Sequence, residues 1–110
     1  MTRYEWIAYH DTHSLHHNET DLYREKQCAE LFDPEHGLIQ YDIINNEMVL
    51  VEIIGHLFFW REIILDIAKR YGYTKIASYH HTLKPKRLER LYKMTAIPIG
   101  ENLYKFEREV

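Results

Sequence analysis

The chain is poor in cysteine, glycine and proline, and this scarcity limits what it can be. Cys28 is the single cysteine among 110 residues, which excludes an intramolecular disulfide and a thiolate zinc site and favours a reducing, intracellular setting. The four glycines and three prolines mark turns only, and no repeat, low-complexity stretch or linker divides the chain. Two separate cores would each be near the size that needs disulfides or metals. We therefore expect one domain over residues 1–110.

The sequence also lacks an excess of positive charge and a long apolar run. Fourteen Lys and Arg against seventeen Asp and Glu give a net charge of -3, which offers no general attraction for nucleic acid or an anionic membrane. Residues 1–10 contain no apolar signal segment, and no later run is long enough to span a bilayer. Hydrophobic residues at 45% and charged residues at 28% exclude disorder as the main state. A cytoplasmic globular protein is expected, without a membrane or nucleic-acid partner.

Hydrophobic periodicity predicts the elements of the first half. Large residues alternate over 4–9, which indicates a strand, and an irregular connection follows over 10–18. Apolar residues recur at helical spacing over 21–32, and Pro34 is expected to end that helix. Residues 38–44 and 48–54 are rich in β-formers and flank the turn-forming pair Asn45 and Asn46, so they predict a hairpin.

The second half predicts a βαβ unit followed by a further helix and a hairpin. A helix is expected over 59–70 with Gly72 as its C-cap, then a strand over 74–79. The order strand, helix, strand implies a parallel pair with a right-handed crossover. A helix with Pro85 in its first turn is expected over 84–94, and strands over 96–99 and 103–106 close the chain. The predicted class is α/β with a mixed sheet in the order β-α-β-β-α-β-α-β-β.

Aromatic residues and histidines are plentiful. Nine Tyr, four Phe and two Trp indicate a core of large rings, and tyrosine-rich edges favour a homodimer. Four of the eight histidines lie close to Asp11, and together they offer enough ligands for a divalent metal: His10, His13, His16 and His17. No established zinc pattern is present. A metal-dependent hydrolase in which His10, His13 and His17 converge is therefore kept as a weaker alternative, and no metal ligand is assigned.

The order of the elements, and above all the stretch 63–108, resembles the GNAT acyltransferase superfamily. That family carries a pattern like Arg-Ala-x-x-Leu-Tyr-x-x-x-Gly-Phe in the helix before its closing hairpin. Here residues 87–97 read Arg-Leu-Glu-Arg-Leu-Tyr-Lys-Met-Thr-Ala-Ile, with Ala96 and Ile97 where Gly and Phe are usual. The resemblance implies a single GNAT-like domain that transfers an acetyl group from acetyl-CoA to an amine. The chain is similar to short GNAT-like proteins of bacteriophages, which would place the protein in the host cytoplasm or the virion.

The same resemblance implies roles for individual residues. Tyr92 stands where many members carry the tyrosine that protonates the departing thiolate, and Glu52 stands where some carry the base that deprotonates the amine. Two readings of Glu52 remain open, because a buried carboxylate would have a raised pKa and suit base work, whereas strict alternation would turn it to solvent. The family binds the CoA pyrophosphate at the loop between its long strand and the following helix. The corresponding segment here has one glycine, and the resemblance assigns cofactor binding to these residues: Ile53, Ile54, Gly55, His56, Leu57 and Arg61.

The segment 58–60 favours an alternative function. Phe58, Phe59 and Trp60 are bulky where an open phosphate cradle is expected, so they either plug the cofactor site or form a patch for a protein partner. The alternative is a non-catalytic accessory, virion or anti-defence protein on a degenerate GNAT scaffold. If the protein is an enzyme, we expect an open cleft between the strands 48–54 and 74–79, where His80 and His81 could line a substrate site. The basic residues of the helix 84–94 are expected to form a solvated face.

Overall fold

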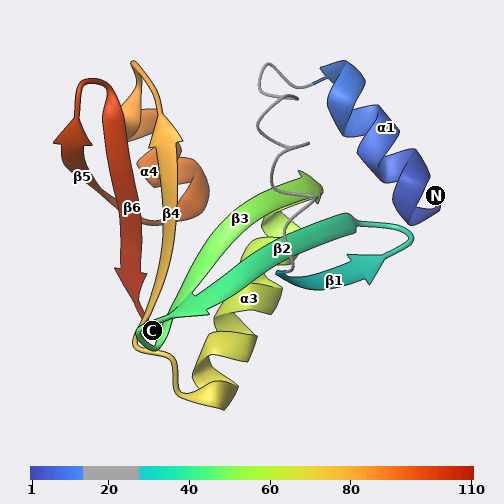
Figure 1. Cartoon of the computed structure of the whole chain (residues 1–110), viewed down its shortest axis with the longest axis horizontal. Coiled ribbons are helices and arrows are strands. Elements are labelled where there is room, and N and C mark those ends of the chain that lie inside the picture. Colours follow the sequence, from blue (N-terminus) through green and yellow to red (C-terminus); the bar gives the residue numbers. More distant parts are fainter. Residues whose placement is uncertain (14–27) are drawn as a thin grey trace.

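The computed structural model describes residues 1–13 and 28–110. Its elements follow one another along the chain as shown in Figure 1: α1 (Arg3–His13), β1 (Ala29–Asp33), β2 (Gly37–Ile44), β3 (Glu47–Gly55), α3 (Leu57–Tyr71), β4 (Lys75–His81), α4 (Pro85–Tyr92), β5 (Thr95–Gly100) and β6 (Leu103–Glu109). None of the described helices is long and apolar enough to cross a bilayer.

The six strands form one mixed sheet in the order β1-β2-β3-β4-β6-β5. β3 and β4 run parallel, joined by the crossover helix α3, and the other neighbours are antiparallel. The predicted α/β class, mixed sheet and βαβ unit are therefore confirmed. The β2–β3 turn uses Asn45 and Asn46 at φ of 51° and 62°, the positive φ values that asparagine tolerates in tight hairpin turns.

The expected strand over 4–9 is wrong, because these residues lie in the helix α1. Thr2 and Glu5 form a reciprocal capping box: the Glu5 N–H donates to Thr2 Oγ1 (3.1 Å), and the Thr2 N–H donates to Glu5 Oε1 (3.0 Å). These bonds satisfy two N–H groups at the start of the helix. Trp6 is buried while Tyr4 and Tyr9 are exposed, so the alternation of large residues does not reflect a buried strand face.

The helix expected over 21–32 is wrong at its C-terminal end, where residues 29–32 belong to the edge strand β1. Residues 21–27 lie outside the described residues. Pro34 occupies the β1–β2 turn, in which Asp33 Oδ1 accepts the Glu35 N–H at 2.8 Å. An Asx turn of this kind reverses the chain, so Pro34 marks a hairpin instead of a helix end. The order over the described residues is α-β-β-β-α-β-α-β-β.

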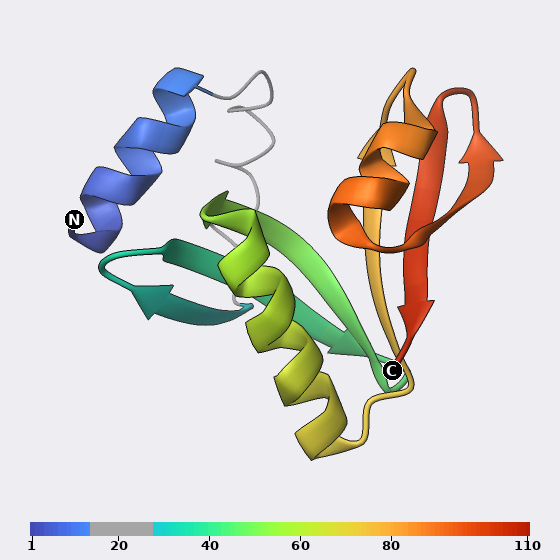
Figure 2. The same ribbon diagram turned by 180° about the vertical axis from the view of Figure 1, so that it is seen from behind.

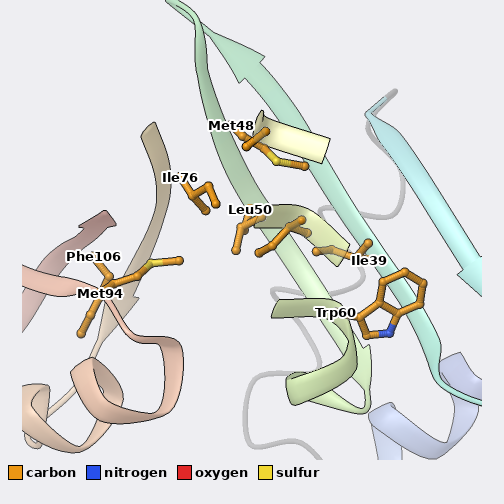
Figure 3. Packing of buried hydrophobic residues seen from close by; sticks show 9 residues of the cluster. Ile39, Met48, Leu50, Trp60, Ile76, Met94 and Phe106 are labelled. Carbon is orange, nitrogen blue, oxygen red and sulfur yellow. The ribbon is translucent and has the colours of Figure 1, made fainter. Parts of the chain in front are cut away.

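Both α3 and α4 cover the same face of the sheet (Figure 2). α3 buries Trp60, Ile64 and Ala68, and Gly72 caps its C-terminus at φ 70° as predicted. The main core contains nine buried side chains, most of which are labelled in Figure 3: Ile39, Met48, Leu50, Trp60, Ile64, Ala68, Ile76, Met94 and Phe106. A smaller cluster of Trp6, Leu38 and Ile54 packs α1 against the sheet.

Candidate active site

Two neighbouring parallel strands separate in the middle of the sheet. β3 and β4 pair only from Glu47↔Lys75 to Val49↔Ala77, and Figures 1 and 2 show them diverging from that end. Beyond Val49, β3 continues to pair with β2, and β4 continues to pair with β6. The edge of β3 that faces β4 is therefore not used by a β4 ladder over residues 50–55. Such an edge can accept an extended ligand through main-chain hydrogen bonds.

A β-bulge on β3 lies within this separation. Gln40 pairs with Glu52 while the next residue, Tyr41, pairs with Leu50, so Val51 is the extra residue and has no partner on β2. Before the bulge, Leu50 faces the core under α3, whereas after it Ile54 packs in the cluster under α1. A bulge reverses which side chains face which side of the sheet, and it directs Glu52 toward α1.

Glu52 is held beside α1 rather than turned to solvent. Its Oε1 lies 3.4 Å from His10 Nε2, and both side chains are 19% exposed. The sequence left open a buried carboxylate or one turned to solvent, and this placement is nearer to the buried one. His10, one of the four clustered histidines, is a neighbour of the candidate base.

Tyr92 is the last residue of α4 and lies against β4 and β6. Its ring stacks on His80 with centroids 5.2 Å apart and planes 16° from parallel, and His80 Nε2 lies 3.1 Å from Ser78 Oγ. Burial raises the pKa of the Tyr92 hydroxyl above its usual value, and the negative charge of Glu52 raises it further. The phenol is therefore protonated at neutral pH.

A row of polar side chains connects Glu52 to β1. Gln40 is the cross-strand partner of both Glu30 and Glu52, and its Nε2 donates to Glu30 Oε1 at 3.0 Å. Arg3 of α1 makes a bidentate pair with Glu30 at 2.6 and 2.8 Å. Gln40 is 2% exposed, and its Oε1 has no hydrogen-bond partner among the described residues. The row ties α1 to β1 and β1 to β2, the strand that pairs with β3.

The connection between β3 and α3 consists of one residue, His56. Its N–H donates to the carbonyl of His36 at 2.9 Å, and its side chain makes no cap bond to α3. Gly55 has φ 105°, and a Cβ there would lie 2.2 Å from His36 O. Gly55 is therefore needed for the close approach of the β1–β2 turn. The N-terminus of α3 has no acidic residue in its first turn, which suits an anion.

The aromatic segment 58–60 divides between core and surface. Trp60 is buried and donates its Nε1–H to His36 O at 3.0 Å, and Phe59 stacks on His36 with centroids 3.8 Å apart. Phe58 is 61% exposed. The two expected alternatives, a plug of the cofactor site or an exposed patch, therefore do not hold for the three rings together, because helical geometry turns Phe59 and Trp60 toward the β1–β2 turn and the core and leaves Phe58 exposed.

Arg61 joins α3 to α4. Its Nη1 donates to the carbonyl oxygen of Leu91 at 2.8 Å, and its guanidinium lies 4.8 Å from the centre of the Phe58 ring. The side chain is 14% exposed. The arginine expected at a phosphate thus contacts the C-terminal half of α4.

The histidine cluster does not form a metal site within the described residues, where no group of three metal-binding side chains is found. His16 and His17 lie outside the described residues. His80 and His81 are the last residues of β4, and His81 lines a cavity of about 870 Å³ beside α4. None of the residues that line this cavity belongs to β3 or α3, so it differs from the cleft expected between the two strands.

Several neighbours of the site were missed from the sequence. The pairing of His10 with Glu52, the stacking of His80 on Tyr92 and the position of Gln40 all join segments that are distant along the chain. The capping box at Thr2 and Glu5 was the available signal for α1, and with α1 recognised, His10 would have fallen on a helix near the sheet. No sequence signal marks the bulge at Val51.

The fold is similar to that of a solved N-acetyltransferase, PaiA from Thermoplasma acidophilum, in a complex with coenzyme A. The TM-score is 0.56 at 18% identity, over 96% of this chain and 76% of the other. This similarity confirms the expected GNAT-like fold. No protein-family model and no curated protein sequence matches the chain.

Proposed function

We propose that this protein binds acetyl-CoA between β3 and β4 and transfers the acetyl group to an amine. The observation that carries the proposal is the separation of β3 and β4 after Val49, which leaves an edge of β3 without a β4 ladder on the strand that carries Glu52. The GNAT-like fold supports it, because the similar N-acetyltransferase was solved with coenzyme A. Acetyl-CoA supplies an activated acyl group as a thioester together with an anionic pyrophosphate.

The chain offers two features that fit this cofactor. The unpaired edge of β3 over residues 50–55 suits the extended arm, which carries amide groups. The N–H groups at the start of α3 suit the pyrophosphate, with Leu57 as the first helical residue. Ile53, Ile54, Gly55, His56 and Leu57 remain the proposed cofactor-binding segment. Arg61 acts in this proposal by holding α4 against α3, since its guanidinium already donates to Leu91.

Glu52 accepts a proton from the attacking amine in this proposal. Its position between the separated strands and α1 keeps it near the open edge of β3, and His10 lies beside it. Tyr92 donates a proton to the departing thiolate, because its hydroxyl carries a proton at neutral pH. A positioned acid or base contributes about 10²–10⁴-fold to rate.

Calorimetric titration with acetyl-CoA and with free CoA tests the first step. Binding with one site per chain, accompanied by a rise in melting temperature, is expected, since a ligand that binds only the native state stabilises it. Consumption of the thioester is then followed with a panel of primary amines: an aliphatic diamine, a lysine peptide and an amino sugar. Glu52→Gln and Tyr92→Phe should bind acetyl-CoA as the wild type does but turn over at least about 10²-fold more slowly.

Two matched variants control for the loss of a charge or hydroxyl elsewhere. Glu47→Gln changes a carboxylate at the far end of β3, and Tyr104→Phe removes a hydroxyl from β6; both should keep wild-type turnover. A flat titration with no thermal shift would refute acetyl-CoA binding. The short β3–α3 connection would then favour the non-catalytic, protein-binding alternative, to be pursued by capture of partners.

A further inference from the structure

The cavity beside α4 is lined by residues to which the proposed acetyl transfer gives no role. It opens to solvent between the end of β4, one side of α4 and the β5–β6 turn, and neither Glu52 nor Tyr92 lines it. The Thr82 N–H donates to Asn102 O at 2.8 Å, which ties the end of β4 to that turn. The volume of about 870 Å³ is within the range of small-molecule sites.

Leucines supply an apolar wall. Leu83, Leu88 and Leu91 line the cavity, and Leu83 is 82% exposed. Covering an exposed leucine stabilises a complex by removing apolar area from water. The wall therefore suits a ligand with an aliphatic or aromatic body.

Two cations lie at the same cavity. Lys84 and Arg87 both line it. Lys84 is the N-cap residue of α4, and its carbonyl oxygen accepts the N–H of Arg87 in the first turn at 3.2 Å. Neither forms an ion pair with a carboxylate of the described residues. Glu101 of the β5–β6 turn also lines the cavity, and its charge opposes a ligand that carries more than one negative charge.

We infer that this cavity binds a small amphipathic monocarboxylate. Its apolar body contacts the three leucines, and its carboxylate lies between Lys84 and Arg87, where Arg87 can donate two parallel hydrogen bonds. Glu101 disfavours a dianion such as a phosphate monoester. The inference does not depend on the proposed acetyl transfer, because it involves other residues and needs no turnover.

Calorimetric titration of the wild-type protein with octanoate, octylamine and octyl phosphate is the test. Octanoate should saturate one site and bind more tightly than either of the others. The double substitution Lys84→Gln with Arg87→Gln should weaken octanoate binding by about tenfold, as expected for two partly exposed charge contacts. Lys86→Gln with Arg90→Gln removes the same charge from α4 residues outside the cavity and should change affinity by less than about twofold. Leu83→Ser should weaken binding without affecting folding, since Leu83 is already exposed.

Three results would overturn the inference. The first is the absence of saturable octanoate binding to the wild-type protein. The second is an equal loss in both double variants, which would indicate a general response to charge. The third is displacement of octanoate by one equivalent of acetyl-CoA or by 3′,5′-ADP, which would make the cavity part of a nucleotide site. Failure of acetyl-CoA to bind would refute the proposed transfer and leave octanoate binding unaffected.

Discussion

Arg61 of α3 donates a hydrogen bond to the carbonyl oxygen of Leu91 in α4, with 2.8 Å between Nη1 and O. The two helices lie on the same face of the sheet over strands that diverge beneath them (Figure 2). The Arg61 side chain thus links the two helices above the region where β3 and β4 form no hydrogen-bonded ladder. The bond satisfies a carbonyl near the C-terminus of α4, where a cation is favourable.

Removing this contact should destabilise the protein. Arg61→Ala deletes a charge-assisted, largely buried bond and is expected to lower the free energy of unfolding by about 2 kcal/mol. Arg70→Ala, which removes an exposed pair with Asp66, should cost less than about 0.5 kcal/mol. Chemical denaturation measures both. Wild-type stability in Arg61→Ala combined with lost acetyl-CoA binding would return Arg61 to a direct role at the phosphates.

Gly37 and Gly55 should resist substitution more than Gly72 does. They pair across β2 and β3 with φ of 104° and 105°, and a Cβ at Gly37 would lie 1.9 Å from Ile54 O. Gly37→Ala or Gly55→Ala must move the backbone and should cost about 3 kcal/mol or more. Gly72→Ala meets open space and should cost about 1 kcal/mol, for its left-handed φ alone. Equal costs at the three sites, measured by denaturation, would contradict the close approach.

The Arg3–Glu30 pair should make stability depend on acid pH. Arg3 and Gln40 hold the pKa of Glu30 below its ordinary value of 4.5, with the bond from Arg3 as the main cause. A lowered pKa in the folded state contributes stability above pH 4.5, which is lost as pH falls through the folded pKa. Glu30→Gln should therefore cost about 1 kcal/mol at pH 7 and almost nothing in strong acid. Glu35→Gln, in the exposed turn, is the control; a cost in Glu30→Gln that does not vary with pH would refute the linkage.

Tyr92 should influence stability at alkaline pH. Its pKa is raised above 10.0, mainly by burial, so the folded state holds the proton more tightly than the unfolded state does. That contribution is complete below pH 10 and is lost as pH rises through the folded pKa. Tyr92→Phe should flatten the alkaline fall in unfolding free energy. The control Tyr104→Phe should keep the steeper fall of the wild-type protein. Identical slopes in the two variants would place the Tyr92 hydroxyl in contact with solvent.

Local chemistry accounts for the parts of the fold that the sequence predicted. The hairpin around Asn45 and Asn46, the helix capped by Gly72 and the final hairpin each carry their signal within a few residues. Residues 4–9 and 29–32 were assigned to the wrong element because short stretches with a few large residues fit both periods. Pairing with β2 decided the second case and a capping box decided the first.

The candidate site likewise has residues that the sequence predicted and neighbours that only the structure revealed. Tyr92 and Glu52 were predicted from their places in a motif and in a long strand; the structure places Tyr92 against His80 and Glu52 beside His10, and their catalytic roles stay predictions. Their setting was not predictable: His10, His80 and Gln40 reach the site from three other elements, and Arg61 makes a contact thirty residues away. Long-range contacts of this kind depend on packing, for which one sequence contains no local signal.

The sequence by itself determined the α/β class, the parallel βαβ unit and the absence of an internal disulfide, because hydrophobic period, turn residues and residue counts act locally. Only the tertiary structure decided where β3 and β4 separate, toward which side Glu52 projects, and which side chains surround a cavity beside α4. The physical reason is that one extra residue, Val51, reverses the facing of everything after it on β3. Its position depends on the partner strand as much as on the strand that carries it.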